Sequence, residues 1–263
     1  MTPRMQAILD RIYQYNARHL AQHTFGLSEE TVYDALLVAP SYAPRKIITD
    51  SRYEIRETGG QSYCTGYEVE GNGLKLAWIK TAAGGCNMLD YLSICGELQF
   101  KRLIFIGAVG ALKPGFEIGD LCTPSFSVAG TMANAYLKEH IRDYQPFEKV
   151  FPDSAYLDQV VNLAAENGIP LRKASVFCTD SISMEYTHLD EIRAFGTDLI
   201  EMETATFYAL AEIMGVPAVA LLVVSDNSAT GAPLVGRSEA LQQRYEHTRR
   251  VVLMELIGKI AGA

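Results

Sequence analysis

The sequence feature that most constrains the fold is the uninterrupted apolar run at residues 218–224. Its seven residues include three valines and show no polar alternation, which predicts a strand buried on both faces. Residues 204–214 before it carry apolar side chains at helical spacing and predict a helix, which Gly215 and Pro217 end. A helix leading into such a strand is typical of a parallel sheet covered by helices, so we predict an α/β protein.

The same patterns predict further elements along the chain. Helices are expected at residues 3–20, 87–98, 154–167 and 238–260, and strands at residues 35–39, 63–70, 74–80, 102–106 and 172–177. No internal repeat, low-complexity segment or change of composition divides the chain. We therefore predict one domain over residues 1–263, with residues 1–33 forming an N-terminal helical extension.

Composition excludes several classes of function. The chain has 263 residues, of which 48% are hydrophobic, and a net charge of −8 without a cluster of lysine or arginine. We therefore expect no nucleic-acid partner and no contact with an anionic membrane. Five scattered cysteines without C-x-x-C spacing indicate neither a disulfide framework nor a zinc site, and no metal or organic cofactor is expected. No apolar stretch is long enough to span a bilayer, so we expect a cytoplasmic protein.

Acidic residues stand at both junctions of the central helix and strand. Glu201 and Glu203 are two residues apart before the helix, so in extended backbone both carboxylates project to one side. Asp226 follows the buried strand, at the sheet edge where open α/β proteins bind ligands. The alternative is structural: Glu203 stabilises the helix N-terminus and Asp226 forms a turn. A shared crevice accounts for all three carboxylates, and we favour it.

These residues, with a glycine segment, resemble a known family. Glu201-Met202-Glu203 before the helix, Val224-Ser225-Asp226 after the strand and Gly107-Ala-Val-Gly110 resemble the nucleoside phosphorylases of the purine nucleoside and uridine phosphorylase superfamily, which includes purine nucleosidases. The resemblance extends over residues 34–261. It implies a three-layer α/β/α fold around a mixed, barrel-like twisted sheet, and a homo-oligomer, either a dimer or a hexamer.

The resemblance also implies roles for the central residues. Asp226 would protonate N7 of a purine, and Glu203 would accept hydrogen bonds from the ribose hydroxyls and stabilise the developing sugar cation. Met202 would pack under the sugar, and Glu201 would brace the site. Further substrate-binding residues would be Ser225, Gly107, Ala108 and Gly110, with Phe177 or Tyr186 as the aromatic wall of the base pocket.

The sequence departs from the family at residues that would bind the phosphate nucleophile. Arg45 and Ser41, in a loop after the strand at 35–39, would bind inorganic phosphate as co-substrate, although Ser41 replaces a glycine. Phe105 replaces the usual arginine, and Ala108 replaces a serine or threonine that binds phosphate. We expect a purine nucleoside phosphorylase that yields free base and ribose 1-phosphate. A hydrolytic purine nucleosidase and a nucleoside-binding protein without turnover remain open alternatives.

Overall fold

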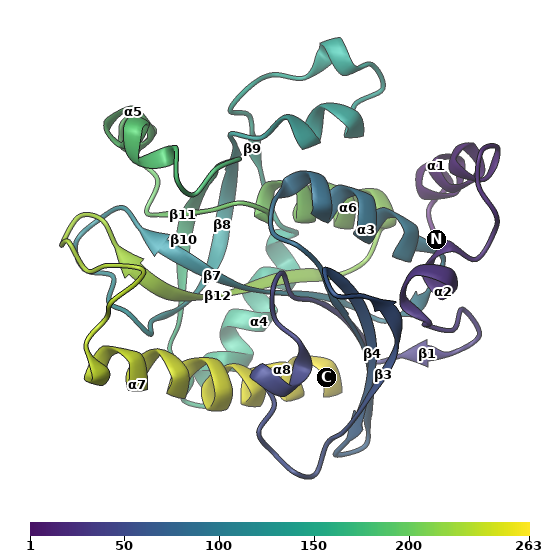
Figure 1. Cartoon of the computed structure of the whole chain (residues 1–263), viewed down its shortest axis with the longest axis horizontal. Helices are drawn as coiled ribbons and strands as arrows, with labels where there is room; N and C mark the ends of the chain where they lie inside the picture. Colours follow the sequence, from purple (N-terminus) through teal and green to yellow (C-terminus); the bar gives the residue numbers. More distant parts are fainter.

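The computed structural model describes residues 1–263 and has an α/β architecture (Figure 1). The helices are α1 (Pro3–Tyr13), α2 (Leu20–Phe25), α3 (Gly85–Ile94), α4 (Ser154–Glu166), α5 (Leu189–Ala194), α6 (Thr204–Met214), α7 (Glu239–His247) and α8 (Leu253–Gly262). The strands are β1 (Val32–Tyr33), β2 (Ala35–Val38), β3 (Glu54–Gln61), β4 (Cys64–Gly71), β5 (Leu74–Lys80), β6 (Gln99–Phe100), β7 (Leu103–Ala111), β8 (Leu121–Ala129), β9 (Lys149–Val150), β10 (Leu171–Cys178), β11 (Leu199–Glu201) and β12 (Ala218–Asn227).

The main sheet is mixed and partly closed. Its order is β11-β10-β8-β12-β7-β2-β5-β4-β3, with β9 on β8. The edge strand β11 also pairs antiparallel with β7, through Leu199 opposite Ala111 and Ile200 opposite Gly110. This pairing closes a ring of five strands, β7, β12, β8, β10 and β11. The predicted barrel-like mixed sheet is confirmed, and closure removes the exposed edge that β11 would otherwise have.

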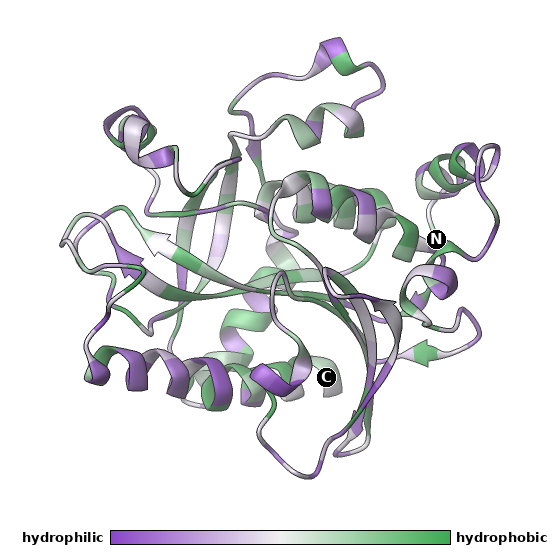
Figure 2. Cartoon of the chain, in the orientation of Figure 1, coloured by the Kyte–Doolittle hydropathy of each residue, from purple (hydrophilic) through white to green (hydrophobic).

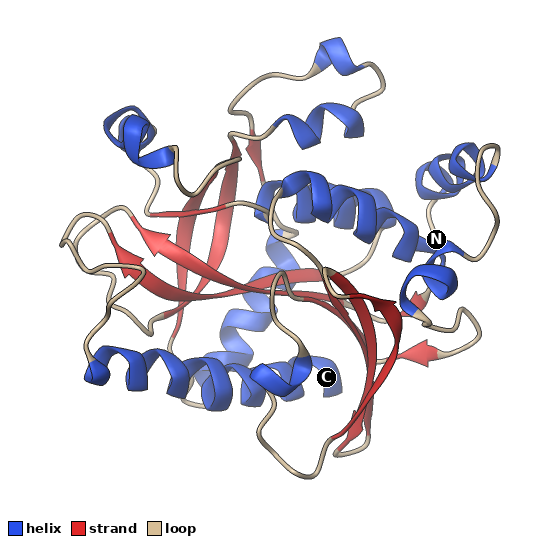
Figure 3. Ribbon diagram, viewed as in Figure 1, coloured by secondary structure: helices blue, strands red, loops and turns tan.

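Helices cover both faces of the sheet, which gives the predicted three layers (Figure 3). Alternate residues of β12 divide between two hydrophobic clusters: Val219, Leu221 and Val223 pack with α4, α7 and α8, while Ala220 and Leu222 pack with α3 and α6. Both faces of β12 are therefore buried, as its unbroken apolar run predicts. Figure 2 shows the contrast between the hydrophobic central strands and the largely hydrophilic α7.

The central helix and strand form where the sequence predicts them. Helix α6 spans Thr204–Met214 and ends at Gly215, whose φ of 69° is the left-handed conformation that favours glycine at this position. Strand β12 continues beyond the predicted Val224 to Asn227, because its partner β7 also runs on through the glycine segment to Ala111. The segment predicted to bind a ligand at the end of β12 is therefore itself part of the hydrogen-bonded sheet.

The structure differs from the predicted elements at three places. The helix expected at residues 3–20 ends at Tyr13, and His19, with a left-handed φ of 66°, precedes α2. The closing helix expected at residues 238–260 is helical from Glu239 to Gly262 but contains a π-helical turn at Thr248–Val252 between α7 and α8. Strand β3 was not predicted, since its residues Glu54–Gln61 are mostly polar or glycine; pairing with β4 makes it a strand.

None of the helices combines the length and hydropathy needed to span a bilayer. Four of the five cysteines are buried, Cys86 is exposed, and all are free thiols.

The N-terminal helices are held by a close approach to the sheet. A Cβ added to Gly66 on β4 would lie 2.1 Å from the carbonyl oxygen of Phe25, the last residue of α2. Gly66→Ala should therefore lower the free energy of unfolding by about 1–3 kcal/mol through overpacking, measured by urea denaturation.

Gly258→Ala is the matched control, because a Cβ on Gly258 in α8 would meet only the Tyr53 hydroxyl at 3.6 Å. Alanine should be neutral or stabilising there. Equal stability of the Gly66 variant and the wild type would contradict the close packing of α2 on β4.

Candidate active site

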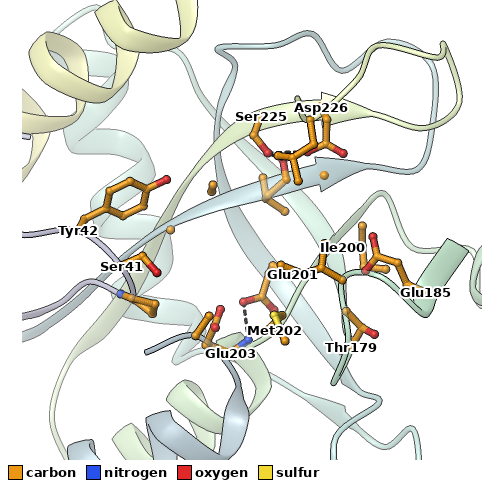
Figure 4. Close-up of a pocket in the computed structure, with 18 of the residues that line it drawn as sticks. Ser41, Tyr42, Thr179, Glu185, Ile200, Glu201, Met202, Glu203, Ser225 and Asp226 are labelled. Carbon is orange, nitrogen blue, oxygen red and sulfur yellow. Dashed lines mark hydrogen bonds between the residues drawn. The ribbon is translucent and has the colours of Figure 1, made fainter. Parts of the chain in front are cut away.

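A cavity of about 170 Å³ lies at the carboxyl ends of the central strands (Figure 4). Its lining comes mainly from five segments distant in sequence: the loop after β2 (40–42), β7 (within 105–110), the segment after β10 (within 179–186), the junction of β11 and α6 (200–203), and β12 (225–226). Ala83 and Leu234 complete it. Most of the predicted site residues meet here, namely Ser41, Gly107, Ala108, Gly110, Glu201, Met202, Glu203, Ser225 and Asp226.

Glu201 joins the sheet to the start of α6. Its carboxylate accepts hydrogen bonds from the backbone N–H groups of Glu203 at 2.7 Å and Thr204 at 2.9 Å, and from the Thr204 hydroxyl at 2.8 Å. The Cys178 thiol on β10 donates to the same carboxylate at 2.8 Å. A carboxylate beside free helical N–H groups is favourable, so Glu201 fixes where α6 begins.

Glu203 has a different environment, although we expected the two carboxylates to project together from extended backbone. The chain leaves the strand between them, and Glu203 has φ −129° and ψ −29° as it enters α6. Its carboxylate accepts a hydrogen bond from the backbone N–H of Gly84 and is almost fully buried. Burial, with the negative charge of Glu201, raises the pKa of Glu203 to about 8.

Asp226 is positioned by an irregularity in β12. The register with β7 shifts between Val224 and Asp226, which turns the Asp226 side chain toward the cavity. Burial raises the pKa of the carboxyl, while a 2.6 Å hydrogen bond from the Ser225 hydroxyl and the charge of Arg237 oppose that rise. Gly110 leaves room for this side chain, because a Cβ there would lie 3.0 Å from Asp226 Oδ2.

The glycine segment accommodates an aromatic ring where the family has an arginine. Phe105 is fully buried and packs against Phe207 of α6, with 5.5 Å between ring centroids. A Cβ on Gly107 would come within 2.6 Å of the Phe105 ring, so glycine is required beside it. Neither the Phe105 nor the Ala108 side chain offers a hydrogen-bond donor to an anion, and no lysine, arginine or histidine lines the cavity.

Two predicted residues lie outside the cavity lining. Arg45 is exposed on a 3-10 turn and donates to the carbonyl oxygen of Ile55 at 3.3 Å. Phe177 packs between Phe147 and Phe195, at centroid distances of 6.1 and 5.2 Å. Their roles in phosphate and base binding stay predictions. Ser41 does line the cavity, and its φ of 64° retains the glycine-like backbone at this position.

The segment after β10 contributes residues that the sequence did not single out. Thr179, Ile182 and Glu185 line the cavity beside Tyr186. Burial and the negative charge of Asp226 raise the pKa of Glu185 to about 7. This segment has no periodicity, and only the fold brings it opposite β12, so local patterns gave no signal for Glu185.

The sequence comparisons identify the family of this chain. The model of the Phosphorylase superfamily matches residues 75–257, so this chain belongs to the phosphorylase superfamily. A DeoD-type purine nucleoside phosphorylase of Caldanaerobacter subterraneus subsp. tengcongensis is 32% identical over 192 residues, covering 72% of this chain and 79% of that protein. Its counterpart in Bacillus velezensis is 27% identical over 161 residues, covering 61% of this chain and 67% of that protein.

Solved structures share the fold at low sequence identity. A P. knowlesi homologue of P. falciparum PNP superposes with a TM-score of 0.66 at 16% identity, covering 90% of this chain and 92% of that one. The AMP nucleosidase from Bacteroides thetaiotaomicron also superposes with a TM-score of 0.66, at 17% identity, covering 99% of this chain and 100% of that one.

The raised pKa of Glu203 predicts a dependence of stability on pH. The folded protein retains the Glu203 proton up to about pH 8, whereas an unfolded glutamate releases it near 4.5. Because the folded state then binds more protons, stability falls as pH rises between these values. Glu203→Gln removes this loss, so the melting temperature of the variant relative to wild type should rise progressively from pH 5 to pH 9.

Glu139→Gln, at an exposed position, serves as the control and should shift melting equally at every pH. If Glu203→Gln also gave a constant difference across this range, Glu203 would not be the buried titrating group. The measurement needs only thermal denaturation of the protein without substrate.

Proposed function

We propose that this protein cleaves the N-glycosidic bond of a purine nucleoside. The observation that carries the proposal is the presence of two carboxyls, the buried Glu203 and the half-buried Asp226, in one cavity of a phosphorylase-superfamily chain. They come from opposite sides of the cavity, and each has a raised pKa. A nucleoside bound between them would place its base at one carboxyl and its sugar at the other.

Asp226 would act on the leaving base. A purine departs more easily when N7 is protonated or hydrogen-bonded, because the base then does not leave as a bare anion. Burial favours the protonated form of Asp226, which can donate that hydrogen.

Glu203 would act on the sugar. Ribose hydroxyls that donate to its carboxylate favour the ionised form, which then places negative charge near the oxocarbenium-like transition state. Met202 lines the cavity beside Glu203 and would contact the sugar.

Two nucleophiles have support. The relatives named purine nucleoside phosphorylase favour phosphate, which would give free base and ribose 1-phosphate. Water is favoured by the absence of any basic side chain in the lining, since a bound phosphate dianion requires cationic or multiple N–H donors. Arg52 and Arg56 pair with Asp50 and Glu68 within the chain and do not line this cavity.

We also propose that the protein functions as a homo-oligomer, a dimer or a hexamer, as the resemblance implies. In that assembly a neighbouring subunit could supply the missing cation. A binding protein without turnover is the remaining candidate, and it would retain nucleoside affinity while leaving the glycosidic bond intact.

Asp226→Asn should lower kcat for purine nucleosides by about 100-fold or more, because the amide cannot supply the proton. The dissociation constant for the nucleoside should change far less, since the side chain keeps its size. Steady-state kinetics and calorimetry measure the two effects separately. Equal losses in turnover and affinity would contradict an acid role for Asp226.

The nucleophile is identified by base release from adenosine, inosine, guanosine, methylthioadenosine and uridine, each with and without phosphate. Phosphate-dependent formation of ribose 1-phosphate would establish phosphorolysis, and free ribose without phosphate would establish hydrolysis. Release of uracil in preference to purines would overturn the purine assignment, and no release from any nucleoside would support the binding protein.

Arg45→Ala tests the predicted phosphate ligand directly. If phosphorolysis is observed and Arg45 reaches the anion, the KM for phosphate should rise at least about tenfold, because a charge-assisted hydrogen bond is lost. Lys46→Ala, which changes the adjacent surface cation, is the control and should leave this KM unchanged. An unchanged KM in the Arg45 variant would remove Arg45 from the site.

A further inference from the structure

The cavity contains a third carboxyl that the proposed reaction leaves unused. Glu185 starts the 3-10 turn at Glu185–His188, on the segment that joins β10 to β11, and its side chain lines the cavity. Its carboxyl makes no hydrogen bond or ion pair within the chain, and burial and the negative charge of Asp226 raise its pKa. A half-buried acid without a partner, directed into a ligand cavity, is available to bind a ligand.

The position of Glu185 relative to the other carboxyls indicates which part of a ligand it meets. Figure 4 shows Glu185 and Asp226 on the same side of the cavity, whereas Glu203 lies toward the opposite side with Ser41. The negative charge of Asp226 raises the pKa of both Glu185 and the adjacent Tyr186. Glu185 therefore belongs to the end that would hold the base, and not to the end that would hold the sugar.

On a purine, the 6-substituent lies next to N7. Resting on the proposed function, in which Asp226 meets N7, we propose that Glu185 is a specificity-determining residue that contacts the 6-substituent of the base and favours 6-aminopurine over 6-oxopurine nucleosides when it is ionised.

The physical basis is the difference between a hydrogen-bond donor and an acceptor. A 6-amino group donates to a carboxylate, whereas a 6-oxo oxygen faces it as a second acceptor and is left unpaired. When Glu185 is protonated, its hydroxyl can donate to the 6-oxo group, and the discrimination weakens. The site would thus distinguish the two bases more strongly as pH rises.

The charged surroundings allow this titration near neutral pH. Burial and Asp226, which faces Glu185 from β12, raise the pKa of Glu185 to about 7. Tyr186 lies on the same turn, and Arg237, in the loop after β12, acts on Asp226. No basic residue lines the cavity to hold Glu185 permanently ionised.

The test is the ratio of kcat/KM for adenosine to that for inosine, measured from pH 5.5 to pH 8.0. Wild type should show a ratio that increases about tenfold or more through pH 7, because the 6-oxo group loses its hydrogen bond as Glu185 ionises. Asp226 and Glu203 act on groups common to both nucleosides, so their titration largely cancels in the ratio.

Glu185→Gln keeps a donor and an acceptor but cannot ionise, so its ratio should be independent of pH. Glu191→Gln is the matched control, because Glu191 belongs to the same segment but is exposed on α5, and it should keep the wild-type profile. A wild-type ratio that does not change with pH, or a Glu185→Gln profile identical to wild type, would overturn the inference while leaving glycosidic cleavage intact.

Binding of free adenine and hypoxanthine, measured by calorimetry over the same pH range, separates this inference from the proposed function. If neither nucleoside is cleaved but adenine is preferred increasingly above pH 7 in wild type and not in Glu185→Gln, the role of Glu185 stands and the enzymatic proposal fails. If neither base binds, the inference fails.

Discussion

The site depends on the buried carboxylate of Glu201. It receives the first N–H groups of α6, the hydroxyl of Thr204 and the thiol of Cys178, and so ties the end of β11, the end of β10 and the start of the helix to one point. Such donors would be costly to bury without an acceptor. One acidic residue thereby positions Glu203 at the first turn of α6, and its charge contributes to the raised pKa of that neighbour.

Closure of the sheet brings the remaining residues of the candidate site together. Pairing of β11 with β7 places Ile200 opposite Gly110, and the absence of a side chain at Gly110 leaves room for Asp226 from β12. Glu203 is therefore held at the start of a helix and Asp226 on a hydrogen-bonded strand, and such elements position side chains more accurately than free loops. The lining combines acidic side chains, Glu185, Glu201, Glu203 and Asp226, with apolar ones that include Phe105.

The cavity differs from a phosphate-binding site in its packing as well as in its charge. Phe105 occupies the space between the sheet and α6 and requires Gly107 beside it, so restoring an arginine at that position would disturb the core. Ser41 keeps a left-handed backbone in the neighbouring loop, although its residue type has changed. This loop thus keeps a conformation that favours glycine, while the lining contains no cationic side chain that could contact phosphate.

Local patterns were sufficient for α6, β12 and the carboxylates at their ends, because burial on both faces and a glycine stop are visible within a few residues. They were insufficient for β3, which pairs with the adjacent β4 despite its polar residues, and for the left-handed residue His19. They also gave no signal for Glu185, because it meets Asp226 only in the folded chain. Arg45 was predicted from its loop, yet its side chain reaches Ile55 outside the cavity lining. The sequence by itself determined the class of fold and which carboxyls stand at strand ends. Only the tertiary structure decided which of them share a cavity and how their pKa values shift, because burial and neighbouring charge are properties of the packed chain.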